Sequence, residues 1–407
     1  MPGAVTSKPR ILIVGCGIGG MAAALCLRRA GMTATVLEQA AALTSVGAGI
    51  QLSPNAVRIL NWLGLEDDLA AFGVLPESLI VRSYDGAPIL ETPLGAAARA
   101  RFGAAYYHAH RADLLSALVA KLGLQGVRLG TRAVDLLQAG DRVGVALADG
   151  SAMEADVVIG ADGIHSMVRG ALFDTEQPRF SGTTAWRGVI PAASVAAFDI
   201  PKTTSVWWGP DRSMVHYYVS GGRAINWIGI VPADGDSVES WSATGAREDA
   251  LREFAGWHPQ VLALIEATEQ PFKWALHDRE PLPSWVDGRI ALLGDAAHSM
   301  LPYHAQGAAQ SIEDAWVLAR CLAEGGDEPE QALARYQSLR IERANWVQRF
   351  SREAEQLFHM ADPEDRRRRD EKLRINQSAY PHGFPPGQER LYGYDAERAV
   401  AEGVAGR

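Results

Sequence analysis

Three glycines near the start of the chain, Gly15, Gly17 and Gly20, have the spacing of a loop that binds a dinucleotide. Glycines in this pattern allow a tight turn and a close approach of the backbone to a pyrophosphate, which then lies at the positive end of a helix. Glu38 follows at the offset expected for an acid that binds a ribose hydroxyl. The pattern is therefore typical of an adenine dinucleotide site, and by itself it fits FAD and NAD equally.

Two later pairs of glycine and aspartate extend this chemistry. Asp162-Gly163 follows an apolar run at 155–160, and Gly294-Asp295 follows a second apolar run. Each pair lies where a strand would turn toward a helix, so backbone N–H groups there can face a phosphate. Asp162 could equally be an ordinary helix cap, whereas Asp295 is placed to accept a hydrogen bond from a ribitol or sugar hydroxyl. Two such strand ends after the glycine loop favour FAD over NAD.

The elements that must position these residues alternate as in an α/β protein. An apolar run at 11–14, a helical pattern at 18–30 and a strand at 33–37 surround the first glycine loop. From about residue 183 to residue 231 the pattern becomes β-rich and aromatic. The other expected strands are 127–129, 133–137, 143–148 and 155–160, and the other expected helices are 55–63, 111–122, 247–266 and 308–319.

The order of these elements predicts a Rossmann-like FAD-binding domain of the glutathione-reductase type with an inserted, mainly antiparallel β-sheet domain that covers the site. A charge run at 366–369 lies among acidic residues and indicates a surface helix with mixed ion pairs. The expected division is 1–182 for the FAD-binding domain with a substrate-side part near 70–105, 183–275 for the sheet domain, 276–350 for helices that complete the FAD-binding domain, and 351–407 for a peripheral, helical C-terminal segment.

Length and composition exclude several classes of function. The 407 residues allow about two to three domains, and the net charge of −9 argues against nucleic acid or an anionic membrane as partner. The sequence contains no apolar run long enough to span a membrane and no signal-peptide pattern, so we expect a cytoplasmic enzyme. Cys16, Cys26 and Cys321 form neither a disulfide framework nor a metal cluster, and we expect no metal.

The three motifs, in this order and at these separations, resemble the class A FAD-dependent aromatic hydroxylases, which are single-component flavoprotein monooxygenases. The similarity extends over nearly the whole chain to about residue 350. It is greatest to the subgroup of salicylate 1-hydroxylase, 3-hydroxybenzoate 6-hydroxylase and 6-hydroxynicotinate 3-monooxygenase. The stretches that support it are 47–55, 110–114, 186–188, 301–307, 311–315 and the tail 391–394.

The resemblance implies a role for the residues around the adenosine end of FAD. Gly15, Gly17 and Gly20 would hold the pyrophosphate, and Glu38 would hold the adenosine ribose. Arg111 matches the family arginine that reaches the FAD.

The resemblance also implies which residues lie toward the flavin. Asp162 and Gly163 would serve both FAD and the nicotinamide donor. Asp295 would bind the ribitol and pyrophosphate region. Gly307 and Ala308 would face the pyrimidine edge of the flavin.

On the substrate side, Gly49 and Gln51 match the loop beside the isoalloxazine. Tyr217 aligns with a tyrosine that faces substrate and could hydrogen-bond a phenolate or carboxylate, although a strand aromatic can also be simply half-buried. His216 should point to the opposite face of the same strand. His304 is expected in a loop under the flavin, as an acid or base or as a structural histidine.

The reaction implied by the resemblance uses NADH or NADPH to reduce FAD, O2 to form a C4a-hydroperoxide, and transfer of OH to an electron-rich ring. The protein must orient that ring and exclude water. We expect a monomer or homodimer that acts on a small hydroxylated aromatic acid, with or without loss of CO2.

Two other activities stay open, namely a monooxygenase of the same fold acting on a larger aromatic or quinone metabolite, and a flavin- or NAD-linked dehydrogenase. Gln51 and Tyr303 stand where the 6-hydroxynicotinate enzyme type has histidine, which weakens that particular assignment. Arg187 could pair with a carboxylate, but on a sheet edge it is expected to be solvated. Trp207 and Trp208 are expected to pack in the sheet domain.

Overall fold

The computed structural model describes residues 9–43, 48–173, 177–233 and 243–403. Gly47, the first residue of one stretch that supports the resemblance, lies outside these ranges. Residues 1–8, on which the signal-peptide expectation depends in part, also lie outside them.

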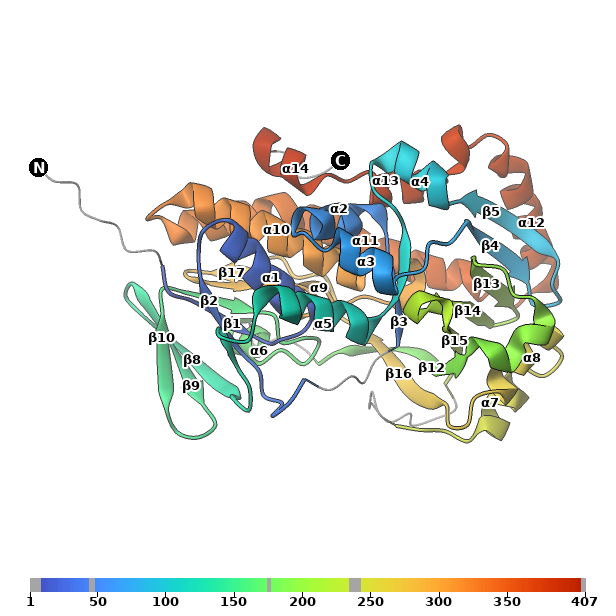
Figure 1. Ribbon diagram of the computed structural model, residues 1–407, viewed down its shortest axis with the longest axis horizontal. Helices are drawn as coiled ribbons and strands as arrows, with labels where there is room; N and C mark the ends of the chain where they lie inside the picture. Colours follow the sequence, from blue (N-terminus) through green and yellow to red (C-terminus); the bar gives the residue numbers. More distant parts are fainter. Residues whose placement is uncertain (1–8, 44–47, 174–176, 234–242, 404–407) are drawn as a thin grey trace, which may run out of the picture.

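A mainly parallel sheet forms the centre of the nucleotide-binding part (Figure 1). One of its two edge strands pairs antiparallel with its neighbour, and all the other neighbouring strands are parallel. The central strands are continuous aliphatic runs because helices and loops cover both faces of the sheet. In spatial order the strands are β17 (Val286–Asp287), β18 (Ile290–Leu292), β11 (Val157–Gly160), β1 (Ile11–Val14), β2 (Ala34–Leu37) and β7 (Val127–Arg128).

Helices α1 (Ile18–Arg29), α5 (Arg111–Leu122) and α10 (Gly307–Gly325) form a layer on this sheet, and α1 packs between the other two. The helix expected at 308–319 is confirmed and continues to Gly325. It is followed by α11 (Pro329–Phe358), which packs along it (Figure 1). The remaining helices of this part are α2 (Pro54–Trp62), α3 (Glu66–Phe72), α4 (Gly95–Phe102), α6 (Met167–Phe173) and α9 (Asp295–His298).

A seven-stranded sheet, antiparallel except for one pair, forms the second layer and confirms the β-rich region expected near 183–231. Two of its strands come from the stretch near 70–105 that was expected on the substrate side. In spatial order the strands are β16 (Phe272–Asp278), β12 (Arg179–Pro191), β15 (Ala224–Pro232), β14 (Arg212–Val219), β13 (Thr204–Gly209), β4 (Ser78–Ser83) and β5 (Pro88–Pro93).

The single helix expected at 247–266 is wrong, because the chain forms two helices, α7 (Arg247–Glu253) and α8 (Pro259–Glu266). Pro259 disfavours the helical conformation of the residue before it and is well suited to the first turn of a new helix. His258 caps α8 by accepting from the backbone N–H of Gln260.

Several shorter elements complete the fold. Strands β3 (Gly49–Leu52) and β6 (Tyr107–His110) pair with each other, and β8 (Ala133–Ala139), β9 (Arg142–Leu147) and β10 (Ala152–Ala155) form a separate antiparallel sheet. The 3-10 turns are η1 (Ala192–Phe198), η2 (Ser220–Gly222), η3 (Pro302–His304) and η4 (Pro381–Gly383). Among the described residues, no helix combines the length and apolar character that a membrane crossing requires.

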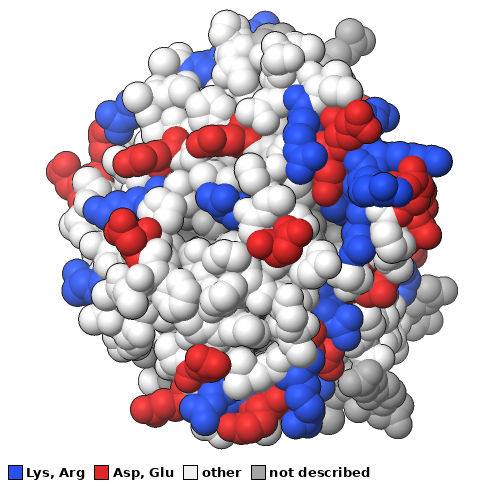
Figure 2. All heavy atoms as spheres, turned by 90° about the vertical axis from the view of Figure 1, so that its right-hand side faces the viewer, with Lys and Arg blue, Asp and Glu red and all other residues white. Residues whose placement is uncertain are grey.

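The C-terminal segment is helical as expected, but it is not peripheral. It contains α12 (Pro363–Gln377), α13 (Pro386–Tyr392) and α14 (Ala396–Glu402), and α12 packs on β5. On the face shown in Figure 2, acidic side chains lie among basic ones, as the charge run at 366–369 indicated.

The expectation that the whole charge run lies on the surface is wrong at Arg369, which is buried. It donates to the carbonyl oxygen of Leu357 over 2.7 Å, and its guanidinium lies 4.7 Å from the ring of Trp208. Arg369 therefore anchors α12 to α11 and to the sheet.

Candidate active site

A cavity of about 840 Å³ lies between the glycine loop and the seven-stranded sheet. Most of the residues singled out from the sequence line it, although they come from elements far apart in the chain. They are Gly17, Gly49, Gln51, Arg111, Gly163, Tyr217, Asp295, His304, Gly307 and Ala308. Four others, Gly15, Gly20, Glu38 and Asp162, do not line it.

The glycine loop has the shape that a pyrophosphate requires. A Cβ on Gly15 would lie 2.4 Å from the carbonyl oxygen of Ala161, and one on Gly20 would lie 2.1 Å from the carbonyl oxygen of Gly15. Gly17 instead has nothing within 4 Å of its Cβ position and opens on the cavity. Helix α1 begins there without a side-chain cap or an acidic residue in its first turn, so its N–H groups and positive end are available to an anion.

Glu38 lies at the end of β2 beside this loop. Its carboxylate accepts from the backbone N–H of Cys16 over 3.0 Å and from that of Ala40 over 2.8 Å. These two bonds fix the side chain beside the glycine loop.

Asp162 acts as a helix cap in this structure. It accepts from Ser166 over 2.5 Å and from the backbone N–H of Val168 over 3.2 Å, at the start of α6. Gly163 has a positive φ of 81° and open space at its Cβ position, and it faces the cavity. The backbone at Gly163, rather than the carboxylate of Asp162, is thus presented to a ligand.

Asp295 faces the cavity across from the start of α10, where the Cβ position of Gly307 lies 3.8 Å from its Oδ1. Burial raises the pKa of Asp295, while the nearby charges of His298 and Arg111 lower it. His298 itself is structural, as expected, because its Nε2 lies 2.6 Å from the buried Asp314.

The seven-stranded sheet supplies one wall of the cavity. One row of neighbouring residues runs across the sheet, and every member lines the cavity. This row is Arg187, Ile228, Val215, Val206, Val81 and Leu90.

Tyr217 is on the cavity face of β14, and His216 points away from it, as the strand alternation predicted. Burial raises the pKa of Tyr217, whereas Arg187 and a hydrogen bond with Gln51 oppose that rise. Gln51 in turn accepts from the hydroxyl of Tyr106 over 2.6 Å. Gln51, Tyr106 and Tyr217 all line the cavity.

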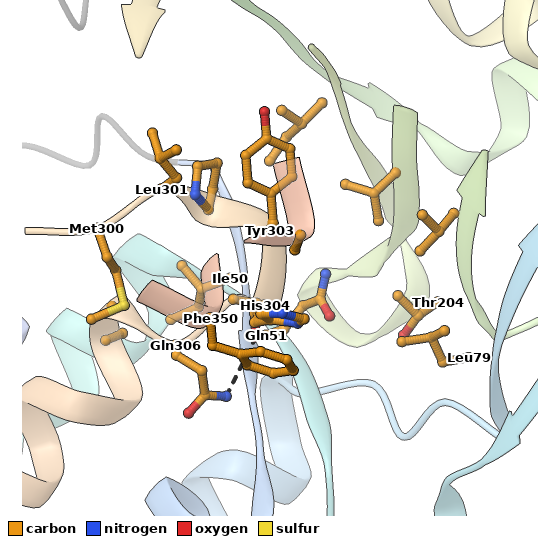
Figure 3. Close-up of a pocket in the computed structure, with 18 of the residues that line it drawn as sticks. Ile50, Gln51, Leu79, Thr204, Met300, Leu301, Tyr303, His304, Gln306 and Phe350 are labelled. Atoms are coloured by element: carbon orange, nitrogen blue, oxygen red, sulfur yellow. Dashed lines mark hydrogen bonds between the residues drawn. The ribbon is translucent and has the colours of Figure 1, made fainter. Parts of the chain in front are cut away.

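His304 stacks on Phe350, with ring centroids 3.9 Å apart and an angle of 10° between the planes (Figure 3). Its pKa falls to about 4 because burial outweighs a hydrogen bond with the backbone of Phe350. Nε2 is buried without a partner among the described residues. The ring of His304 is therefore a neutral imidazole with one nitrogen that makes no hydrogen bond to the described part of the chain.

Arg187 is the functional candidate that sequence reasoning undervalued. It lies on β12, which is flanked by β16 and β15, so it is not at a sheet edge. Its guanidinium lies 4.1 Å from the ring of Trp274, and its buried Nε has no partner in the described part of the chain. Burial lowers its pKa to about 10; the hydroxyl of Tyr217 opposes this and the charge of Arg111 reinforces it.

A second cavity of about 140 Å³ meets the first at Arg187, Ile228, Asp295, Met300 and Pro302. Among the described residues no carboxylate forms an ion pair with Arg187. The cavity wall thus carries a partly buried cation that an anionic ligand can satisfy. The signal available in the sequence was that successive side chains on a strand point to opposite faces. Trp186 is buried on one face, and Arg187 faces the cavity on the other.

Buried His216 gives a test of the sheet domain. Burial, reinforced by the charge of Arg82, lowers its pKa to about 3, so it stays neutral in the folded protein while the unfolded chain binds a proton below about pH 6.5. Folding stability therefore falls as pH falls, by about 1.4 kcal/mol per unit. Between pH 7.5 and 5.0 we expect wild type to lose about 2 kcal/mol more than His216→Phe in urea unfolding. Equal losses of stability in wild type and His216→Phe would contradict this. So would an equally reduced pH dependence in His165→Gln, which changes an exposed histidine.

The fold and the cavity define a protein that binds an adenine dinucleotide at its glycine loop and holds a second ligand against a sheet. Residues 8–351 match the FAD binding domain family. The chain belongs to this family, and it is an FAD-dependent aromatic monooxygenase of class A.

Several relatives cover most of the chain. The sequence is 39% identical over 401 residues to 3-amino-4-hydroxybenzoate 2-monooxygenase of Streptomyces cremeus, with 98% of each protein covered. It is 40% identical over 363 residues to 6-hydroxynicotinate 3-monooxygenase of Pseudomonas fluorescens, covering 88% of this chain and 94% of that protein. A salicylate hydroxylase substrate complex has a TM-score of 0.82 at 28% identity, with 98% of each chain covered.

Proposed function

We propose that this enzyme hydroxylates a small hydroxylated aromatic acid of the salicylate type, with NADH or NADPH and O2 as co-substrates. The observation that carries this proposal is the polarity of the cavity. Within apolar walls it combines the phenol of Tyr217, the imidazole of His304 and the guanidinium of Arg187, which has no carboxylate partner among the described residues. An aromatic ring with one carboxylate and one hydroxyl satisfies these groups. The relatives that act on 3-amino-4-hydroxybenzoate, 6-hydroxynicotinate and 3-hydroxybenzoate support this ligand chemistry.

For the adenosine end of FAD, we propose that Gly15, Gly17 and Gly20 bind the pyrophosphate. Glu38 accepts hydrogen bonds from the adenosine ribose, and Arg111 reaches the cofactor from the start of α5. When bound, FAD supplies hydride acceptance from the nicotinamide donor and activation of O2.

At the flavin end, Asp295 would hold the ribitol, and Gly307 with Ala308 would offer the positive end of α10 to the flavin. Gly163 would offer its backbone N–H to the cofactor or to the donor. Gly49 would lie beside the flavin, and a Cβ there would collide with Tyr217.

The chain's own residues then orient the substrate. Arg187 pairs with the carboxylate, Tyr217 donates a hydrogen bond to a substrate oxygen, and His304 accepts the hydrogen of the substrate hydroxyl at Nε2. A phenol that gives up its proton becomes a more electron-rich ring, which favours attack on electrophilic oxygen. The apolar walls exclude water, which would otherwise divert the reaction to H2O2. The ring carbon that faces the flavin decides whether the carboxylate is kept or lost as CO2.

Turnover of the purified yellow protein tests this proposal. With salicylate, 3- and 4-hydroxybenzoate, 3-amino-4-hydroxybenzoate and 6-hydroxynicotinate, we expect at least one acid to stimulate NADH or NADPH oxidation. Mass spectrometry should show a product with one added oxygen, or a catechol with loss of CO2, and little H2O2. Benzoate, which lacks the hydroxyl, is the matched control. Bound FAD without a response to any hydroxylated acid would refute the small-acid assignment.

A larger aromatic substrate is the second candidate, and one feature favours it. Beyond the polar groups the cavity continues over apolar side chains of the sheet and the C-terminal segment, including Leu79, Leu90 and Leu373. A relative 38% identical over 337 residues is the aurachin C monooxygenase/isomerase of Stigmatella aurantiaca. Stimulation by an alkylated quinone, with no response to benzoates, would favour this candidate.

A further inference from the structure

Four planar side chains stack in series between helix α13 and the cavity. The ring of His304 stacks on Phe350, which also lines the cavity, and Phe350 stacks on Trp346 with ring centroids 5.2 Å apart and 13° between the planes. The guanidinium of Arg390 on α13 lies 3.9 Å from the centroid of the Trp346 ring. Because Trp346 and Phe350 are four residues apart on α11, they share one face of that helix. The stack thus connects His304 to two helices.

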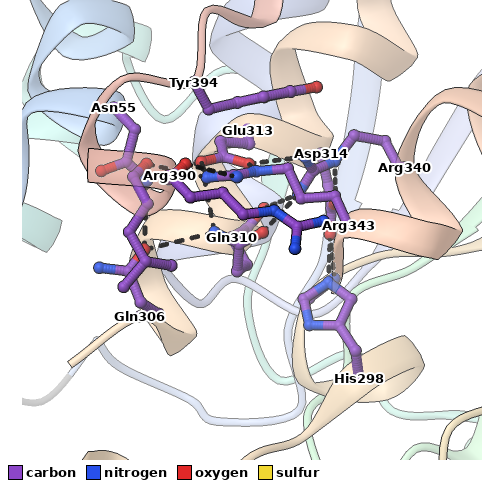
Figure 4. A network of polar contacts seen from close by, with 12 residues as sticks. Asn55, His298, Gln306, Gln310, Glu313, Asp314, Arg340, Arg343, Arg390 and Tyr394 are labelled. Carbon is purple, nitrogen blue, oxygen red and sulfur yellow. Dashed lines mark hydrogen bonds and ion pairs between the residues drawn. The ribbon is translucent and has the colours of Figure 1, made fainter. Parts of the chain in front are cut away.

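A buried ionic cluster holds α13 at the outer end of this stack. Arg343 pairs with the buried Glu313 over 2.7 Å. It also donates to the carbonyl oxygens of Arg390 over 3.2 Å and Leu391 over 3.0 Å (Figure 4). The main chain that carries the Arg390 guanidinium is therefore tied to α11 by bonds that do not involve the stacked side chains.

Phe350 is also confined at its edge. A Cβ on Gly387 would lie 2.4 Å from Cζ of Phe350, so the backbone of α13 packs directly against this ring. With His304 and Trp346 stacked on it, the plane of the Phe350 ring is determined by its neighbours (Figure 3).

The backbone at His304 is fixed independently of its ring. Ala305 has a positive φ of 53°, a conformation that a residue with a side chain adopts only where its surroundings impose it. Its N–H donates to the carbonyl oxygen of Pro302 over 2.9 Å. Gln306 donates to Ser53 over 2.9 Å and to the carbonyl oxygen of His304 over 3.4 Å. These bonds leave the ring plane undetermined, because the last side-chain torsion of histidine is broad.

We propose that Phe350 is a positioning residue that acts through His304, holding the imidazole plane so that its nitrogen without a partner in the described part of the chain can meet the substrate hydroxyl. This inference rests on the proposed function, because it takes His304 to contact the substrate. An aliphatic side chain at position 350 would fill the same space but leave the imidazole free to turn. Phe350 therefore governs the selection of a hydroxylated ring, and the C-terminal segment contributes by packing on Phe350.

The first test compares Phe350→Leu with Phe358→Leu in FAD-loaded protein. Phe358 is the matched control because it lies on the same helix and lines the same cavity, but its ring is edge-on to His304, with centroids 6.4 Å apart and 80° between the planes. Flavin absorbance titration gives the ratio of the benzoate Kd to the Kd of the hydroxybenzoate that binds most tightly. We expect this ratio to be about ten in wild type, about three or less in Phe350→Leu, and within about two-fold of wild type in Phe358→Leu.

A double-mutant cycle then asks whether Phe350 acts through His304. Phe350→Leu added to His304→Leu should lower the ratio no further, and a loss as large as in the wild-type background would overturn the proposal. If Phe350→Leu does not retain FAD, Phe350→Met carries the same expectation with a side chain that adapts to irregular gaps.

The outcomes separate this inference from the proposed function. A wild-type enzyme that binds no aromatic acid would refute the proposed function and this inference with it. A wild type that prefers the hydroxylated acid, together with equal ratios in Phe350→Leu and Phe358→Leu, would overturn this inference alone.

Discussion

Arg340→Met is expected to lower the free energy of unfolding by about 3–5 kcal/mol, because it removes the cation that two buried carboxylates share. The guanidinium of Arg340 lies 2.6 Å from Glu313 and 2.8 Å from Asp314, and all three side chains are fully buried. A third bond joins it to the amide oxygen of Gln310 over 2.9 Å. The measurement is urea unfolding of FAD-loaded protein and of apoprotein at pH 7.5.

Arg335→Met provides the control on the same helix. Arg335 also pairs with a carboxylate, Glu324, over 2.6 Å, but both side chains are 39% exposed. Such a pair contributes about 1 kcal/mol or less. A loss for Arg340→Met no larger than that for Arg335→Met would show that the buried cluster does not stabilise the fold.

The cluster around Arg340 also connects stability to the active site. Asp314 accepts from the backbone N–H of Gly294 over 3.0 Å, at the turn that presents Asp295. Gln310 bonds to Gln306 over 3.3 Å, just before the start of α10 at the cavity. We therefore expect apoprotein of the Arg340→Met variant to regain FAD more weakly than that of the Arg335→Met variant.

The parts of the site that could be predicted from the sequence are those fixed by local geometry. The glycine loop and Asp295 follow apolar strands directly, so a few consecutive residues determine where they point. Tyr217 could be assigned to one face of its strand because side chains alternate at every residue.

The parts that could not be predicted depend on pairings between distant segments. Arg187 looked solvated because the place of its strand within the sheet is set by neighbours at 224–232 and 272–278. Tyr392 looked peripheral because the ring it packs against, Tyr106, belongs to a distant part of the chain. Polar residues inside a tail that is rich in Gly and Pro carry no local sign of burial, and only the assembled core supplies it.

Arg187→Met is expected to raise the Kd for the aromatic acid by about 30-fold or more, since loss of one member of a buried charge pair costs about 2–5 kcal/mol. The effect should be confined to the acid. For the corresponding carboxamide, which is uncharged, the variant and the wild type should differ by less than about three-fold. Flavin absorbance titration measures both ligands without turnover, and steady-state kinetics should place the loss mainly in KM.

Arg82→Met is the matched control. Arg82 follows Val81 on the same strand of the sheet, and the side chain of Val81 lines the cavity. Because side chains alternate along a strand, Arg82 points to the opposite face. It removes an equal charge from the same sheet without altering the cavity, so the acid Kd should stay within about two-fold. Equal losses for acid and carboxamide in Arg187→Met would mean that the arginine shapes the cavity rather than binding the carboxylate. Selective loss for the acid alone would place the substrate carboxylate at β12, which leaves the ring and its hydroxyl to Tyr217 and His304.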